Sequence, residues 1–134
     1  MTVKEYLGQA YRLDQRINSK IEQVSSLNDL ATKCTSTISD MPRSATPNNS
    51  RMEDIILKII DLQNEINSDI DRLVDLKREM VGIIKGVDNI ECQTVLELRY
   101  LCFKTWEQIA VDMGYTTRNL HLLHKKALNQ IIIS

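Results

Sequence analysis

The side chains best suited to recognition chemistry lie in one stretch of the chain, from Thr116 to Lys126. An arginine can donate two parallel hydrogen bonds to one guanine in the major groove of DNA, and Arg118 could make this contact. Thr117 and His121 could donate to bases or phosphates, and lysines are better suited to phosphates. The candidate DNA-contacting residues are Thr116, Thr117, Arg118, His121, Leu122, Lys125 and Lys126.

These residues must be presented by a helix, and the spacing around them predicts two helices joined by a tight turn within residues 105–131. The turn falls at Gly114, because glycine adopts positive φ at little cost, and Ala110 is small enough for the helices to cross closely. Thr116 or Thr117 can cap the second helix. The inward-facing residues are Ile109, Met113, Leu120 and Leu123. This register is typical of DNA-binding helix-turn-helix units, although other helix pairs with a glycine turn bind nothing.

The same stretch resembles, without a gap, the helix-turn-helix in the C-terminal region of bacterial sigma factors, which reads the promoter −35 element. The shared residues are Thr105, Glu107, Ile109, Gly114, Thr116, Lys126, Ala127 and Leu128, and the preceding VLELRYL at 95–101 matches the helix before that unit. Over roughly residues 88–134 the pattern looks most like small phage and prophage proteins related to late-gene transcription regulators. The resemblance implies a DNA-binding regulator in the bacterial cytoplasm and contact with RNA polymerase. Sigma factors have arginine where His121 lies, so the −35 sequence is not implied as the target.

The charge balance gives limited support to DNA binding. The chain has 17 lysines and arginines against 18 aspartates and glutamates, for a net charge of −1. However, residues 116–134 contain Arg118, Lys125 and Lys126 and no acidic residue. The positive charge is therefore local, and binding should weaken steeply as salt rises.

The chain as a whole is expected to be all-α, with a long antiparallel helical hairpin (coiled coil) at 1–87 and a three-helix helix-turn-helix domain at 88–134. Apolar residues recur at alternating spacings of three and four, which places them on one stripe of a helix. The first seam holds Val3, Tyr6, Ala10, Leu13, Ile17, Lys20, Val24, Leu27, Ala31, Cys34, Ile38 and Met41, and the second holds Met52, Ile55, Ile59, Leu62, Ile66, Asp69, Leu73, Leu76, Met80, Ile83, Val87 and Ile90. Pro42 and Pro47 predict a connecting loop over 41–50, with Ser50 and Glu53 as a capping box.

Two charged residues interrupt the seams, and the hairpin places them opposite each other. They are Lys20 and Asp69, and a turn centred near residues 44 and 45 would bring them together. We therefore predict an ion pair or shared polar layer that fixes the register. The alternative is that both side chains reach solvent while Ile21 and Ile70 fill the core.

The second long helix carries more apolar residues than one partner helix needs. Its stripe is widened by Ile56, Ile60, Ile70, Val74 and Ile84. A wide stripe indicates more than one neighbour. We expect self-association, most simply a twofold dimer with a four-helix core, unless the C-terminal domain packs over these residues.

No other chemistry is favoured. Cys34, Cys92 and Cys102 fit no common zinc spacing and are expected to pack in the core. The pair His121 and His124 lacks further metal ligands, so no metal and no cofactor are expected. The sequence shows no cluster of side chains typical of a catalytic nucleophile, so we expect no enzyme activity. The N-terminus lacks a signal-peptide pattern and no apolar run could span a bilayer, so we expect a cytoplasmic protein.

Three functions remain open at this point. The first is a transcription regulator of phage or prophage origin that binds double-stranded DNA as a dimer and possibly touches RNA polymerase. The second is a phage DNA-packaging recognition subunit, which would form a ring. The third is a sigma-like module that binds RNA polymerase or another protein, which the near-neutral charge and the apolar Leu122 favour.

Overall fold

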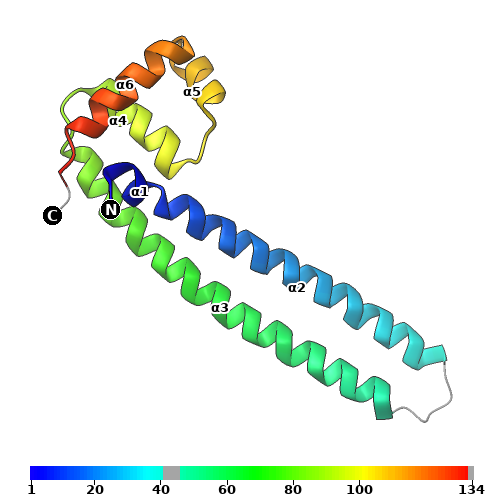
Figure 1. Ribbon diagram of the computed structural model, residues 1–134. Helices are drawn as coiled ribbons and strands as arrows, with labels where there is room; N and C mark the ends of the chain where they lie inside the picture. The colour runs from blue at the N-terminus through cyan, green and yellow to red at the C-terminus, as the bar shows by residue number, and fades with distance from the viewer. Residues whose placement is uncertain (41–45, 133–134) are drawn as a thin grey trace. The chain divides into compact units, whose positions relative to one another are not determined.

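The computed structural model describes the backbone of residues 1–40 and 46–132, and the side chains of residues 1–34 and 50–132. All regular secondary structure in this part of the chain is helical, which confirms the predicted fold class (Figure 1). The elements are α1 (Val3–Leu7), α2 (Gln9–Asp40), α3 (Thr46–Lys85), α4 (Ile90–Leu96), the π-helix η1 (Glu97–Leu101), α5 (Trp106–Met113) and α6 (Thr117–Asn129).

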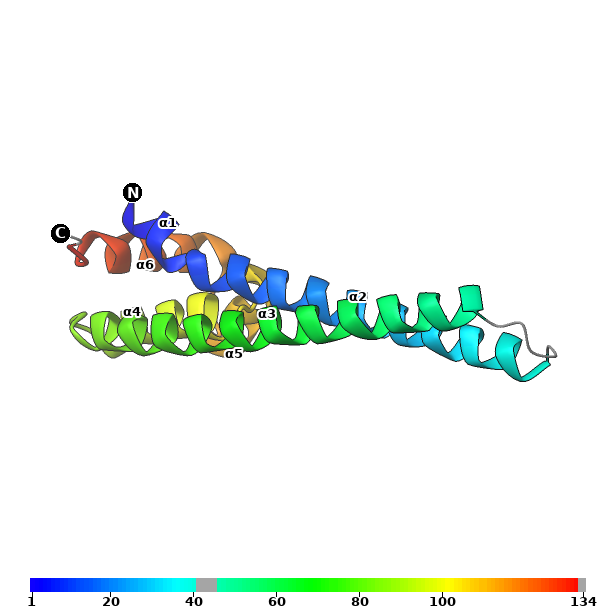
Figure 2. The ribbon, with the colours of Figure 1, turned by 90° about the horizontal axis from the view of Figure 1, so that it is seen from below.

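The chain divides into two compact units, which are described separately. The hairpin unit is Gln15–Asp71, and the head unit combines Met1–Asp14 with Arg72–Ser134. In the hairpin unit, α2 and α3 run antiparallel and side by side (Figures 1 and 2). Its core is the predicted seam, in which Ile17, Leu62 and Ile66 are buried.

The two seam charges meet inside the hairpin unit. Nζ of Lys20 lies 2.6 Å from Oδ2 of Asp69, and their side chains are only 11% and 9% exposed. A second carboxylate, that of Glu65, lies 3.4 Å from the same ammonium and is half exposed. The predicted ion pair is therefore confirmed, and Ile21 and Ile70 are exposed rather than core residues.

The start of α3 was predicted too late. The helix begins at Thr46, so Pro47 lies in its first turn and Ser50 lies inside it instead of capping it. Proline is tolerated in a first turn, because the N–H that it lacks would have no helical partner there. Residues 41–45 of the predicted loop, and the side chain of Ile38, lie outside the described residues.

The head unit has its own core. Leu7 of α1, Met80 and Ile84 of α3, and Leu96 of α4 are almost completely buried together with residues of α6. Helix α4 begins after Asn89, whose side chain accepts from the amide of Glu91, and η1 continues it to Leu101. The assignment of Ile90 to the seam was wrong, because Ile90 is exposed. Near the end of the chain, Ile131 packs in the core and Ile132 is exposed.

The wide apolar stripe of α3 has two different environments. Ile84 is only 1% exposed because the head unit's own helices cover it. In contrast, Ile56, Ile60, Ile70 and Val74 remain between 40% and 48% exposed. Packing by the C-terminal helices therefore explains why one of the five residues, Ile84, is apolar.

The cysteines also differ from one another. Cys92 is buried and Cys34 is half-buried, as expected for packing residues, but Cys102 is exposed. The prediction was wrong for Cys102 because the helix ends at Leu101, one residue before it. No helix in the described part of the chain is long and apolar enough to cross a membrane.

Candidate nucleic-acid interface

The turn between α5 and α6 has the predicted backbone. Helix α5 begins with a capping box, in which the Thr105 side chain accepts from Gln108 N and the Gln108 side chain accepts from Thr105 N. It ends at Gly114, which has φ 73° and ψ 29°, the left-handed conformation that favours glycine. The amide of Tyr115 then donates to the carbonyl of Ala110 at 3.0 Å. These contacts fix the direction in which α6 leaves the turn.

Helix α6 is held by one apolar side. Thr116 is its N-cap, with Oγ1 accepting from the amide of Asn119 at 3.2 Å. Leu120 and Ala127 are fully buried, and Leu120 packs with Ile109 and Val95. The predicted inward positions are therefore correct, and the opposite side of α6 faces away from the core.

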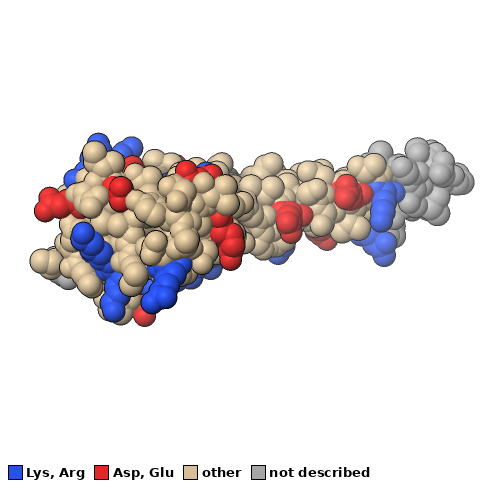
Figure 3. Space-filling view, turned by 90° about the horizontal axis from the view of Figure 1, so that it is seen from above, with Lys and Arg blue, Asp and Glu red and all other residues tan. Residues whose placement is uncertain are grey.

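The candidate contact residues share this outward side. Each of the seven is exposed in the head unit, and Leu122 is 61% exposed. Arg118, Lys125 and Lys126 make no ion pair with any described residue. Figure 3 shows lysine and arginine side chains gathered on one part of the head unit's surface. Cations without an internal counterion are available to an external anion.

Trp106 is part of the packing beneath this surface. Its ring centroid lies 4.8 Å from that of His121 and 4.6 Å from that of His124. The guanidinium of Arg99 lies over the same indole, 4.6 Å from the centroid. Because the indole contacts His121, it restricts the positions that this exposed imidazole can take.

The two histidines of α6 lie in opposite environments. His124 is only 6% exposed, and its Nε2 lies 2.7 Å from the hydroxyl of Tyr100. Burial, with smaller contributions from Lys4, His121 and Arg99, lowers the pKa of His124 to about 4. Burial likewise raises the pKa of Tyr100 to about 12. His124 is therefore a neutral core residue near pH 7, and of the two histidines only His121 is exposed.

A shallow groove borders the same side of α6. It has a volume of about 280 Å³ and lies between the start of α4 and the outer residues Leu122 and Lys126. Glu91 contributes the acidic side chain of its wall, and Tyr115 an aromatic one. The groove therefore combines an apolar side chain, Leu122, with charged and aromatic ones.

The sequence did not predict that Arg99 contacts Trp106 or that Tyr100 contacts His124. Arg99 and Tyr100 both lie in η1, where the backbone bond from Cys102 N to Glu97 O, 3.0 Å long, spans five residues instead of four. No spacing rule indicated this π-turn. The burial of His124 could have been inferred, because it lies four residues after Leu120 and three before Ala127 on one side of α6.

The donors of the described residues form no metal site: among them, no group of three or more histidines, cysteines, aspartates and glutamates could hold a metal ion. No curated protein and no solved structure matches the chain. A family model described as a protein of unknown function (DUF1492) matches residues 35–131. This match includes all of α3 and the complete helix-turn-helix. The chain belongs to the DUF1492 family of proteins of unknown function.

Proposed function

We propose that the chain is a DNA-binding transcription regulator of phage or prophage origin, which reads double-stranded DNA with α6. The main support for this proposal is that the residues selected by the helix-turn-helix pattern are also exposed, on α6 or at its N-cap. The seven residues selected from the sequence are all exposed, and three of them are cations without an ion-pair partner among the described residues. The resemblance of residues 88–134 to the sigma-factor helix-turn-helix supports the same function.

Each exposed residue of α6 has its own role in this proposal. In helix-turn-helix proteins the start of the second helix enters the major groove. Thr116, Thr117 and Arg118 occupy the N-cap and first positions of α6. In this proposal Arg118 contacts a guanine edge. Lys125 and Lys126 lie two turns later, where they would neutralise phosphates and set the register.

The exposed stripe on α3 supports a homodimer in this account. Ile56, Ile60 and Ile70 lie in the hairpin unit and remain partly exposed, as does Leu57 at 59%. A second copy could bury these residues through a twofold interface, since the same surface would then serve both partners. Two copies would present two α6 helices to half-sites related by the same symmetry.

Leu122 and its groove favour a second function, that of a sigma-like module which binds RNA polymerase or another protein. A large apolar side chain that is 61% exposed beside a groove of about 280 Å³ is a suitable protein-binding surface. In that case Leu122→Ser would abolish partner binding. For DNA binding, the same change would weaken only the recognition of thymine methyl groups.

The two functions can be distinguished by selecting bound fragments from a pool of random DNA duplexes. We expect the wild-type chain to enrich a sequence that contains guanine at the Arg118 position. Arg118→Ala should relax the preference there by roughly 1–3 kcal/mol while the other positions persist. Lys58→Ala, at an exposed lysine of the hairpin unit, is the matched control and should leave the selected sequence unchanged. Failure to enrich any duplex would contradict the DNA-binding proposal.

A further inference from the structure

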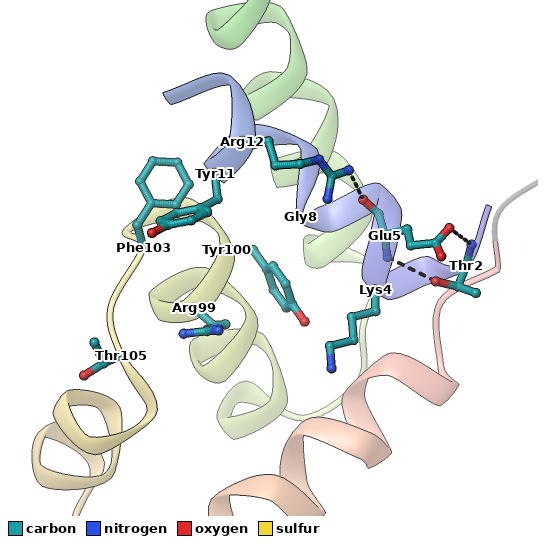
Figure 4. A pocket seen from close by; sticks show the side chains of 10 residues that line it. All are labelled: Thr2, Lys4, Glu5, Gly8, Tyr11, Arg12, Arg99, Tyr100, Phe103 and Thr105. Carbon is teal, nitrogen blue, oxygen red and sulfur yellow. Dashed lines mark hydrogen bonds between the residues drawn. The ribbon is translucent and has the colours of Figure 1, made fainter. Parts of the chain in front are cut away.

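A cavity in the head unit is lined by no residue of α6 and has no role in the proposed function. Its volume is about 520 Å³, within the range of pockets that bind small molecules. Its walls come from α1, the first turn of α2, η1 and the residues that follow η1 (Figure 4). All of its lining residues belong to the head unit.

Three cations line this cavity against one carboxylate. Lys4, Arg12 and Arg99 reach it from α1, α2 and η1 respectively (Figure 4). The carboxylate is that of Glu5, which already accepts a hydrogen bond from the amide of Thr2 at 3.2 Å. The side chains lining the cavity therefore carry a net charge of +2, counted as three positive and one negative group.

Two of the cations are held in place. Nη1 of Arg99 donates to the carbonyl of Lys104 at 3.0 Å, and its guanidinium lies over Trp106. Nη2 of Arg12 donates to the carbonyl of Glu5 at 3.3 Å. The ammonium of Lys4 makes no hydrogen bond or ion pair with a described residue. Fixed guanidinium groups and an unpaired ammonium are the donors that phosphate groups prefer.

Two aromatic rings form another wall. Tyr11 and Phe103 pack edge to face, with their centroids 5.6 Å apart. Figure 4 shows the two rings side by side. Phe103 has φ 59°, a left-handed conformation that costs a residue with a side chain about 1 kcal/mol. The π-helix η1 ends at Leu101, two residues before Phe103, and π-turns inside helices are frequent at functional sites. Strained backbone of this kind persists where the surrounding structure requires it.

We propose that this cavity binds a phosphate monoester that also carries an aromatic ring, as a nucleoside monophosphate does. A phosphate monoester carries a charge of about −1.5 to −2 at neutral pH, which matches the net charge of the lining side chains. Its phosphate lies among Lys4, Arg12 and Arg99, and its ring lies against Tyr11 and Phe103. The proposal does not depend on DNA binding by α6.

The chain contains one tryptophan, which reports on this site. Because Arg99 lies over Trp106, a phosphate that contacts Arg99 should change the tryptophan fluorescence. We would titrate the wild-type chain with phenyl phosphate and with the four nucleoside monophosphates AMP, GMP, CMP and UMP, and measure the same titrations by calorimetry. At least one of them should bind saturably. Adenosine, phenol and inorganic phosphate should each bind more weakly than the aromatic phosphates.

Two variants test the two halves of the site. Lys4→Ala should raise the Kd of the bound phosphate about tenfold, because it removes one charged hydrogen-bond donor, and Lys58→Ala is the matched control that should not. Phe103→Gly removes a ring and relieves the positive φ, so it should weaken aromatic phosphates while leaving inorganic phosphate unaffected. Absence of saturable binding by every aromatic phosphate would overturn the proposal. An unchanged Kd in Lys4→Ala, or equal affinity for inorganic phosphate, would also overturn it.

Discussion

The ammonium of Lys20 lies 2.6 Å from the carboxylate of Asp69, across the two antiparallel helices of the hairpin unit. Both groups are largely buried, so their desolvation is compensated by their mutual attraction. A shift of one helix against the other by a turn would place each charge among apolar side chains. The pair therefore selects one register of the hairpin.

Removing one partner of the Lys20–Asp69 pair should destabilise the hairpin unit. Lys20→Met leaves the Asp69 carboxylate buried with less compensation, and should lower the free energy of unfolding by about 3 kcal/mol. Replacing both residues, as Lys20→Met with Asp69→Leu, should recover most of that loss. Urea denaturation at one fixed protein concentration measures both. Arg78→Ala, at a largely exposed ion pair, is the control and should change the free energy by less than about 1 kcal/mol. A double variant no more stable than the single one would contradict this account.

Acid should destabilise the head unit through His124. Burial holds the pKa of His124 at about 4, below the ordinary histidine value of 6.5, so the unfolded chain binds this proton more readily. The resulting stability is complete above about pH 6.5 and is lost as the pH falls towards 4, by up to roughly 3 kcal/mol. Denaturation curves recorded between pH 7 and 4, a range that spans the folded and ordinary pKa values of His124, measure this loss of stability. His124→Gln should reduce the pH dependence.

The cause of that pKa shift can be tested separately. Burial is the largest contribution, so Tyr100→Phe, which removes the hydroxyl bonded to His124, should keep most of the pH dependence. Loss of the dependence in Tyr100→Phe would mean that the hydrogen bond, and not burial, keeps His124 neutral.

The turn of the helix-turn-helix should depend on glycine. Gly114 has φ 73°, and a Cβ there would meet nothing within 4 Å, so Gly114→Ala should destabilise by about 1–2 kcal/mol through backbone strain alone. Gly82→Ala, inside α3 and equally free of contacts, should instead stabilise by about 0.5–1 kcal/mol. Thermal unfolding of the two variants distinguishes the effects. A similar change in both would contradict the role given to Gly114.

Self-association should depend on the exposed stripe of α3. A charge introduced by Ile60→Glu, at a residue that is 46% exposed, should shift the chain from dimer to monomer in sedimentation equilibrium. Val111→Glu, at an equally apolar but 81% exposed residue of α5, is the control and should leave the dimer intact. A monomeric wild-type chain, or a ring of eight or more copies, would contradict a twofold dimer.

The sequence predicted the features that follow from periodicity and from local backbone rules. The heptad seams predicted the contact between Lys20 and Asp69. Glycine's tolerance of positive φ predicted the turn at Gly114. The start of α3 was missed because Pro47 was treated as excluding a helix, although first turns accept proline. The cavity could not be predicted, because it brings Lys4 and Arg12 together with Arg99, and that proximity arises from tertiary packing alone.

The central claim is that α6 presents a surface that binds a DNA duplex. Its most direct test is a mobility-shift titration with duplex fragments at about 50 mM salt, where phosphate contacts contribute most. The wild-type chain and Lys58→Ala should shift the duplex with equal affinity, while Arg118→Ala with Lys126→Ala should lose binding without losing helical structure. An unshifted duplex with the folded wild-type chain, or unchanged affinity in the double variant, would contradict the claim.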